Sequence, residues 1–211
     1  MAPARAVGGD LYDFFPLKDG KVGIAIGDVS DKSVSAALFM ALFSSLLRVE
    51  AKRANNPREV FRQVNNHLLE RNETGMFVTA VYGVLDVSTG EYSYARAGHE
   101  VPILIDPNGR PFTPEQGIGQ PLCIFPEPEI DVQKVQISPG HTLLLYTDGI
   151  TDATNLKNLR FGLERLVNSS RLKNVLSAQE LCDQIIGDIQ TFQGHQPQFD
   201  DMTLVAIHRR G

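Results

Sequence analysis

The sequence predicts an α+β fold, an α-β-β-α sandwich of two antiparallel sheets flanked by helical pairs. Most of the predicted strands are joined by short turns, as in hairpins, and the predicted helices come in two pairs. A doubly wound parallel sheet would instead alternate one helix with each strand. With 211 residues, of which 42% are hydrophobic, the chain is long enough for one substantial core. We therefore expect a single domain over residues 1–211.

The first predicted elements form a hairpin. Residues 11–15 and 22–26 form the strands, and Asp19-Gly20 supplies the positive φ angles of the turn. Residues 34–53 follow with apolar side chains at helical spacing. Asp28 is thus expected in the turn between a strand end and a helix, where the scaffold fixes its backbone and its carboxylate projects into a cleft.

The remaining elements follow from capping signals and from changes of period. Asn56 is a helix cap, Pro57 takes the first helical position and Glu59 stands three residues after the cap, so a second helix begins here. Residues 76–87 then alternate between apolar and other side chains, which predicts a long strand. The other predicted elements are strands over 91–97, 101–105, 130–137, 141–147 and 202–208, helices over 159–166 and 177–192, and proline-rich or polar loops over 113–129 and 194–198.

Composition excludes several classes of function. The formal net charge of −5 argues against nucleic acid as a partner, because neutralising phosphates takes clustered Lys and Arg. Cys123 and Cys182 lack CxxC spacing and indicate neither a zinc site nor a disulfide framework, which fits a reducing cytoplasm. The longest apolar stretch, residues 36–47, contains two serines and is too short for a bilayer, so no membrane association is expected.

Carboxylates recur in four turn-like clusters beside predicted strand ends. Any one cluster is most simply a helix cap or an Asx-turn. Four such clusters together favour a site where their carboxylates converge on divalent cations, because Mg²⁺ and Mn²⁺ prefer oxygen ligands. Two such ions about 4 Å apart can bind and orient a phosphate. The clusters contain Asp10 and Asp13, Asp28, Asp148 and Asp152, and Asp200 and Asp201.

The order of these motifs along the chain resembles that of the PPM metal-dependent Ser/Thr protein phosphatases, specifically the bacterial SpoIIE/RsbU-like branch. The resemblance extends from residue 8 to the last strand and implies the α-β-β-α sandwich of that family. The motifs that carry it are Gly8-Gly9-Asp10, Gly27-Asp28-Val29-Ser30, Ala97-Gly98-His99, Thr147-Asp148-Gly149 and Asp200-Asp201-Met202-Thr203.

The resemblance also implies roles for individual residues. Two Mn²⁺ or Mg²⁺ ions, with a third ion held more weakly, would activate the water that hydrolyses the phosphoester directly. Asp28, Asp148 and Asp200 would be the catalytic carboxylates. The metal ligands that the resemblance implies are Asp28, the Val29 carbonyl, Asp148 and Asp200, with Asp10 acting through water and Asp152 binding the third ion. Asp13 and Asp201 would support these ligands. Arg5 and Lys32 would contact substrate.

The chain departs from the family pattern at three places. Asp31 and Ser33 stand where this branch usually has glycine, and Glu100-Val101 replaces the usual Asn-Pro. If the two glycine positions need positive φ, Asp tolerates it better than Ser. Ser30 occupies the position of a His found in animal members, so the acid that protonates the leaving group stays open. His99 is expected to be a structural histidine.

The function implied is hydrolysis of phosphoserine on a small regulatory protein, of the anti-anti-sigma or STAS type, in a bacterial partner-switching pathway. In such relatives the catalytic domain follows a sensor or response-regulator module, so the chain is expected to be the C-terminal part of a longer regulatory protein. Two alternatives stay open: a catalytically weakened module that binds phosphoproteins, and a two-metal hydrolase of a small phosphoester or nucleotide.

Overall fold

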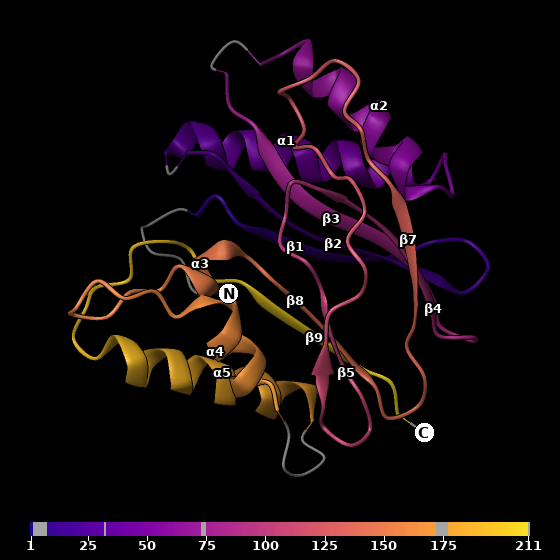
Figure 1. Cartoon of the computed structure of the whole chain (residues 1–211). Coiled ribbons are helices and arrows are strands. Elements are labelled where there is room, and N and C mark those ends of the chain that lie inside the picture. Colours follow the sequence, from indigo (N-terminus) through magenta and orange to yellow (C-terminus); the bar gives the residue numbers. More distant parts are fainter. Residues whose placement is uncertain (2–7, 32, 73–74, 172–176, 211) are drawn as a thin grey trace. The chain divides into compact units, whose positions relative to one another are not determined.

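The computed structural model describes residues 1, 8–31, 33–72, 75–171 and 177–210 (Figure 1). The chain divides into two compact units. The first unit comprises residues 5–100 and 116–136, and the second unit comprises residues 1–4, 101–115 and 137–211. Each unit carries one antiparallel sheet and its own helices, so the predicted α+β class with two antiparallel sheets is confirmed.

The sheet of the first unit has the strand order β1-β2-β3-β4-β7 within the described residues. Asp19 and Gly20 have φ angles of 57° and 71°, as predicted for the turn that joins its first two strands. All neighbouring strands are antiparallel. The strands are β1 (Leu11–Pro16), β2 (Lys21–Val29), β3 (Val78–Asp86), β4 (Glu91–Ala97) and β7 (Val132–Gln136).

Two helices, α1 (Val34–Ala51) and α2 (Pro57–Leu69), lie along one face of this sheet (Figure 1). Their buried side chains join those of the sheet in one core, in which the ring of Tyr82 on β3 contacts Phe15 and Phe61. By length and composition, α1 is the one described helix that could cross a membrane, a test that core helices also pass. Since much of α1 packs in this core, we interpret it as a core helix.

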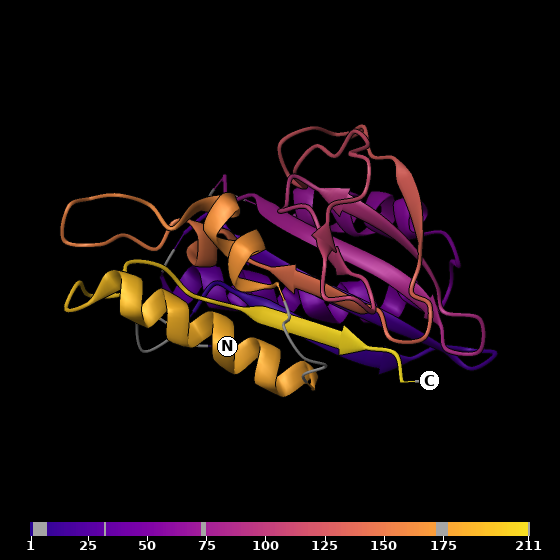
Figure 2. The same ribbon diagram turned by 60° about the horizontal axis from the view of Figure 1, so that its bottom comes forward.

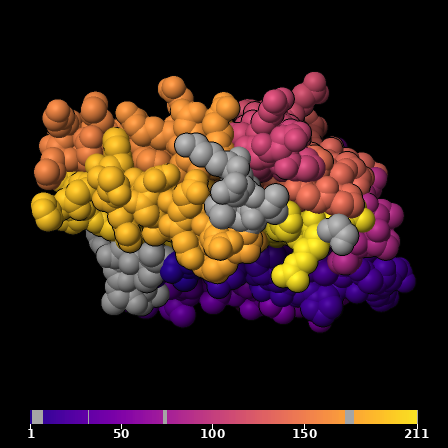
Figure 3. All heavy atoms as spheres, turned by 90° about the horizontal axis from the view of Figure 1, so that it is seen from below, coloured from indigo at the N-terminus to yellow at the C-terminus, as the bar shows by residue number. Residues whose placement is uncertain are grey.

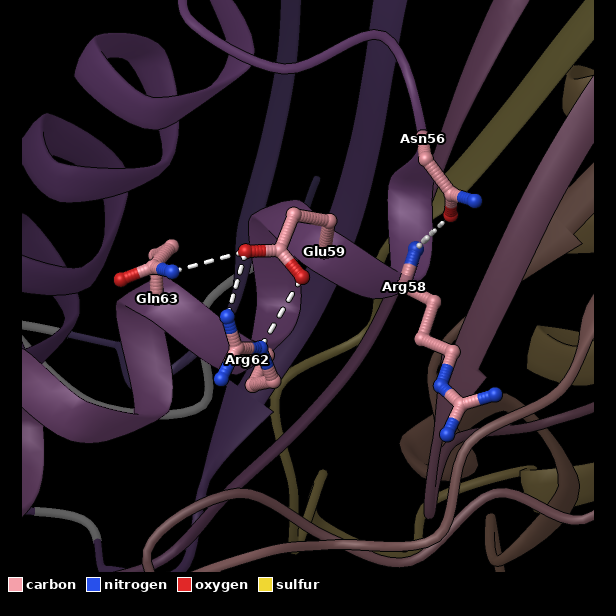
Figure 4. Close-up of polar contacts among 5 residues, drawn as sticks. All are labelled: Asn56, Arg58, Glu59, Arg62 and Gln63. Carbon is pink, nitrogen blue, oxygen red and sulfur yellow. Dashed lines mark hydrogen bonds and ion pairs between the residues drawn. The ribbon is translucent and has the colours of Figure 1, made fainter.

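The predicted start of α2 is confirmed in detail (Figure 4). The Asn56 side chain accepts a hydrogen bond from the backbone N–H of Arg58 at 2.9 Å, and Pro57 opens the helix. Glu59 accepts hydrogen bonds from Arg62 and from Gln63 one turn later. These bonds, led by the one from Arg62, lower the pKa of Glu59 to about 2 and keep its carboxylate ionised near the positive end of the helix dipole.

Asn65, on the buried face of α2, holds the loop that precedes β7. Its side-chain N–H groups donate to the carbonyls of Phe125 and Pro126, and its Oδ1 accepts from the backbone N–H of Cys123 at 2.8 Å. Cys123 has a φ of 68°, which is strained for a residue with a side chain. The three hydrogen bonds therefore stabilise a backbone conformation that the loop would not otherwise keep.

Replacing Asn65 by Ala is expected to lower the free energy of unfolding by about 3 kcal/mol, because buried backbone groups lose their partners. Urea denaturation followed by circular dichroism measures the change. Asn66 is the matched control: it is the next residue of the same helix and is exposed. Asn66→Ala is expected to change the unfolding free energy by less than about 0.5 kcal/mol. Equal effects of the two substitutions would contradict the proposed role of Asn65.

In the part of the second unit that the structure describes, the strand order is β6-β5-β8-β9. The longest described helix of this unit, α5, runs beside β9 (Figure 2), and its N-terminus is held by a capping box of Ser177 and Glu180. Figure 3 shows the outer face of α5, in orange to yellow. Apart from Gly187, the exposed residues of this helix are polar. The elements are β5 (Ile103–Ile105), β6 (Pro111–Phe112), β8 (Thr142–Tyr146), α3 (Asp148–Thr151), α4 (Gly162–Ser169), α5 (Ala178–Gln193) and β9 (Leu204–His208).

Three local predictions need correction. Asp28 lies inside β2, opposite Thr79 of β3, and not in the turn after the strand. The short helix α3 begins at Asp148, where only a turn was expected. The helix predicted over 159–166 starts later, at Gly162, because Arg160 pairs with Thr154 in an isolated β-bridge.

Candidate metal-binding residues

In the first unit, Asp10 and Asp28 lie at the same end of the β1–β2 hairpin. Leu11 pairs with Gly27, and extending this antiparallel register by one residue places Asp10 opposite Asp28. A methyl group added to Gly9 would lie 3.0 Å from Oδ1 of Asp28 and 3.3 Å from the carbonyl oxygen of Val29. The two predicted ligand atoms of β2, Oδ1 of Asp28 and the carbonyl oxygen of Val29, therefore both lie close to Gly9, which has no side chain to separate them.

The backbone conformation of the loop after β2 explains why serine can occupy one of the two positions that are usually glycine. Ser33 has an extended backbone, with φ −107°, and caps α1 by accepting a hydrogen bond from the N–H of Ala36. Its hydroxyl also donates to Asp31 at 2.6 Å. Among the described residues, neither Asp31 nor Ser33 is in the left-handed region, so this loop conformation does not require glycine at either position.

Ser30 and His99 hold the backbone around Asp28. The N–H of Ser30 donates to the carbonyl of Phe77, and the Ser30 hydroxyl accepts from the N–H of Phe77. His99 is buried, with its Nδ1 3.0 Å from the hydroxyl of Thr79, the residue opposite Asp28. This contact agrees with the structural role expected for His99.

In the second unit, Asp148 and Asp200 are brought together across 52 positions of sequence. Asp148 is the first residue of α3, directly after β8. A methyl group added to Gly149 would lie 1.8 Å from the carbonyl oxygen of Asp201 and 3.3 Å from Cβ of Asp200. Asp148-Gly149 and Asp200-Asp201 are therefore packed backbone to backbone.

Hydrogen bonds between two threonines fix this pair of segments. The backbone N–H of Thr147 donates to the carbonyl of Thr203 at 3.1 Å, and the N–H of Thr203 donates to the Thr147 hydroxyl at 3.0 Å. Both threonines are fully buried. The pair ties the chain just after β8, which leads into Asp148, to the chain just before the neighbouring strand β9, which follows Asp200.

Two of the predicted site carboxylates bind arginines. Asp13 accepts hydrogen bonds from Nε and Nη2 of Arg48, which attaches α1 to β1 and raises the pKa of Arg48. Asp152 accepts one from Nη1 of Arg160 at 2.8 Å. The supporting role of Asp13 and the metal-binding role of Asp152 stay predictions. Arg5 and Lys32, predicted to contact substrate, lie outside the described residues.

The donor chemistry of the two groups fits hard divalent cations. Their candidate ligand atoms are carboxylate and carbonyl oxygens, which Mg²⁺ and Mn²⁺ prefer, often with several waters retained. Over the described ranges, no three His, Cys, Asp or Glu side chains are placed to hold a metal ion. Gly9 and Gly149 belong to the motifs named from the sequence, but their close approach to Asp28 and to Asp201 was not predicted.

Comparisons with known proteins agree with this chemistry. Residues 18–210 match the family model described as stage II sporulation protein E (SpoIIE). Protein IcfG of Synechocystis is 35% identical over 98% of the chain and 37% of its own length. Phosphoserine phosphatase RsbU of Bacillus subtilis is 26% identical over 99% of the chain and 61% of its own length. The chain therefore spans between about a third and three fifths of these relatives.

The fold itself is similar to that of solved phosphatase domains. The structure titled SiaA-PP2C domain of Pseudomonas aeruginosa has a TM-score of 0.84 with this chain, covering 98% of it and 82% of that domain. The sequence identity is 19%, so this likeness shows the fold alone. The fold class expected from the sequence, that of the PPM or PP2C phosphatases, is confirmed.

Proposed function

The chain belongs to the SpoIIE family of PP2C-type phosphatases, and on this premise we propose that it is a Mn²⁺- or Mg²⁺-dependent protein serine/threonine phosphatase. The observation that carries the proposal is the proximity of the Asp148 and Asp200 segments, which are hydrogen-bonded through Thr147 and Thr203, together with the position of Asp10 opposite Asp28. Four carboxylates from distant parts of the chain thus form two oxygen-rich groups, each fixed by a glycine contact or by strand register.

The roles proposed for the ligands follow from these groups. Asp28, the Val29 carbonyl and Asp10 would bind metal from the first unit, and Asp148 and Asp200 would do so from the second. When bound, the ions supply a water activated for attack on phosphorus and neutralise the charge that develops on the phosphoryl group. Asp152 is proposed for a third ion, for which it would exchange its bond to Arg160.

The remaining side chains of the site keep these ligands in place. The Thr147–Thr203 pair fixes the ends of β8 and β9, and the Thr79–His99 pair fixes the strand opposite Asp28. Holding the ligands in position matters for catalysis, because displacing a reacting group by about 1 Å lowers the rate on the order of 10²-fold. We propose that Asp201, whose carbonyl contacts Gly149, supports Asp200 in the same way.

The substrate proposed is phosphoserine on a small regulatory protein of the anti-anti-sigma or STAS type, in a bacterial partner-switching pathway. The relative RsbU, described as a phosphoserine phosphatase, supports the phosphoserine part of this proposal. We further propose that residues 1–211 act as a single catalytic domain, as the C-terminal part of a longer regulatory protein, in the cytoplasm.

The purified chain is expected to hydrolyse a phosphoserine peptide and p-nitrophenyl phosphate when MnCl₂ or MgCl₂ is present. EDTA should abolish turnover and an excess of Mn²⁺ should restore it, because the carboxylates alone cannot activate the water. Release of phosphate and of p-nitrophenol measures the two reactions. Absence of turnover at every metal concentration would instead favour a phosphoprotein-binding module. A clear preference for nucleotides over phosphopeptides would favour a small-phosphoester hydrolase.

A further inference from the structure

The second unit contains an open pocket of about 500 Å³, within the usual size range of ligand pockets. One wall is a hairpin-like loop that contributes Asp152, Thr154, Asn158 and Arg160. The other wall is formed by residues 196–199, which lead directly into Asp200. Because Asp152 and Asp200 are proposed metal ligands, a molecule in this pocket would lie beside the reacting phosphate.

The loop that forms the first wall is held by its own hydrogen bonds. Asn155 Oδ1 accepts from the backbone N–H groups of Lys157 and Leu159, at 2.9 and 3.1 Å. Asn158 takes the left-handed conformation, with φ 57°, which asparagine tolerates better than most residues. Arg165 on α4 donates to the carbonyls of Arg160 and Phe161 at the base of the loop. This wall is therefore held by hydrogen bonds within the chain.

Large apolar side chains are exposed in the pocket at Phe199 and, outside its lining, on the neighbouring loop. Phe199 lines the pocket with 78% of its surface exposed, and Leu156 and Leu159 of the loop are 68% and 52% exposed. Apolar side chains exposed to water are unfavourable in an unbound protein, and they are typical of surfaces that bind other proteins. The pocket is thus suited to a polypeptide rather than to a small polar metabolite.

Arg160 is the positively charged residue of the pocket lining, which also contains Asp152. Its Nη1 donates to Asp152, while Nε and Nη2 donate to no residue in the described part of the chain. The side chain is 69% exposed, so this edge of the guanidinium is accessible. Two parallel N–H groups of this kind match the two oxygens of a carboxylate.

We propose that this pocket docks the polypeptide segment next to the phosphoserine of the protein substrate. Arg160 pairs there with an acidic side chain of that segment, and Phe199 packs on its apolar part. The inference rests on the proposed phosphatase function and adds to it a preference for phosphoserines with acidic neighbours.

The test compares two phosphoserine peptides that differ only in carrying Asp or Lys at the positions flanking the phosphoserine. Wild-type protein is expected to favour the acidic peptide in kcat/KM, and Arg160→Glu is expected to shift the ratio of the two values by about tenfold toward the basic peptide. Arg171→Glu is the matched control, because it makes the same charge change at an exposed residue outside the pocket. It is expected to shift the ratio by less than about twofold.

Binding provides a second readout that needs no turnover. Fluorescence anisotropy with the same peptides, carrying a non-hydrolysable phosphonate, should show the same shift for Arg160→Glu and about fivefold weaker binding of the acidic peptide by Phe199→Ala. If wild-type protein hydrolyses p-nitrophenyl phosphate but Arg160→Glu leaves both peptide ratios unchanged, the docking inference is overturned and the phosphatase proposal stands. If wild-type protein hydrolyses none of these substrates, the phosphatase proposal fails and the docking inference fails with it.

Discussion

Asp28→Asn is expected to lower kcat/KM for p-nitrophenyl phosphate by about 10³-fold. Asp148→Asn is expected to lower it by a slightly smaller factor. An amide is nearly the same size as a carboxylate but carries no charge, so the strand keeps its shape while the affinity for a divalent cation falls. Steady-state kinetics over a range of MnCl₂ concentrations measures the loss. Calorimetric titration with Mn²⁺ should show weaker binding in the same variants, which separates a missing ligand from a disturbed fold.

Asp19→Asn provides the control for this substitution. Asp19 lies in the β1–β2 turn with a φ of 57°, a conformation that asparagine also adopts, and it has no proposed part in catalysis. Its kcat/KM should stay within about twofold of the wild-type value. An Asp28→Asn variant with wild-type kinetics and wild-type Mn²⁺ affinity would show that Asp28 is not one of the metal ligands.

Local chemistry made part of the fold predictable from the sequence. The Asp19-Gly20 turn and the Asn56-Pro57 helix start depend on residues within a few positions of one another, and both formed as expected. The short helix α3 was missed because four residues carry too little periodicity to be recognised. Boundaries of strands were the least predictable feature, because pairing partners far along the chain decide them.

Asp28 shows how a distant partner decides local structure. Gly27 and Asp28 are poor strand formers, so the sequence favoured a turn at this point. In the structure, β3 supplies hydrogen-bonding partners as far as Val29, and this pairing extends β2 through both residues. Tertiary pairing therefore outweighed intrinsic propensity, and it placed the Asp28 carboxylate on a strand, where it is held more firmly than in a turn.

In the candidate site, too, the features set by neighbouring residues were predictable and those set by distant partners were not. The residue types and the order of the carboxylates could be read from the sequence, since they are properties of single motifs. The Arg48–Asp13 pair joins residues 35 positions apart, and the Gly149 contact with Asp201 joins residues 52 positions apart. Neither has a local signal, because one depends on the packing of α1 on β1 and the other on the approach of two backbones.

Gly149→Ala is expected to lower the free energy of unfolding by about 3 kcal/mol and kcat/KM by on the order of 10²-fold. The new methyl group would overlap the carbonyl oxygen of Asp201, a backbone atom that no side-chain rotation can move away. The 200–201 segment must then shift and carry the Asp200 carboxylate with it. Urea denaturation and steady-state kinetics on the same samples measure the two losses.

Gly187→Ala is the matched substitution. Gly187 lies inside α5 with no atom within 4 Å of the added methyl group, so only helix propensity changes. This variant is expected to gain about 0.5–1 kcal/mol of stability and to keep its activity. Because both variants add one methyl group to a glycine in the second unit, the difference between them isolates the contact with Asp201. Equal stability and activity in the two would mean that the tight packing of Gly149 against the Asp200-Asp201 segment does not position a catalytic carboxylate.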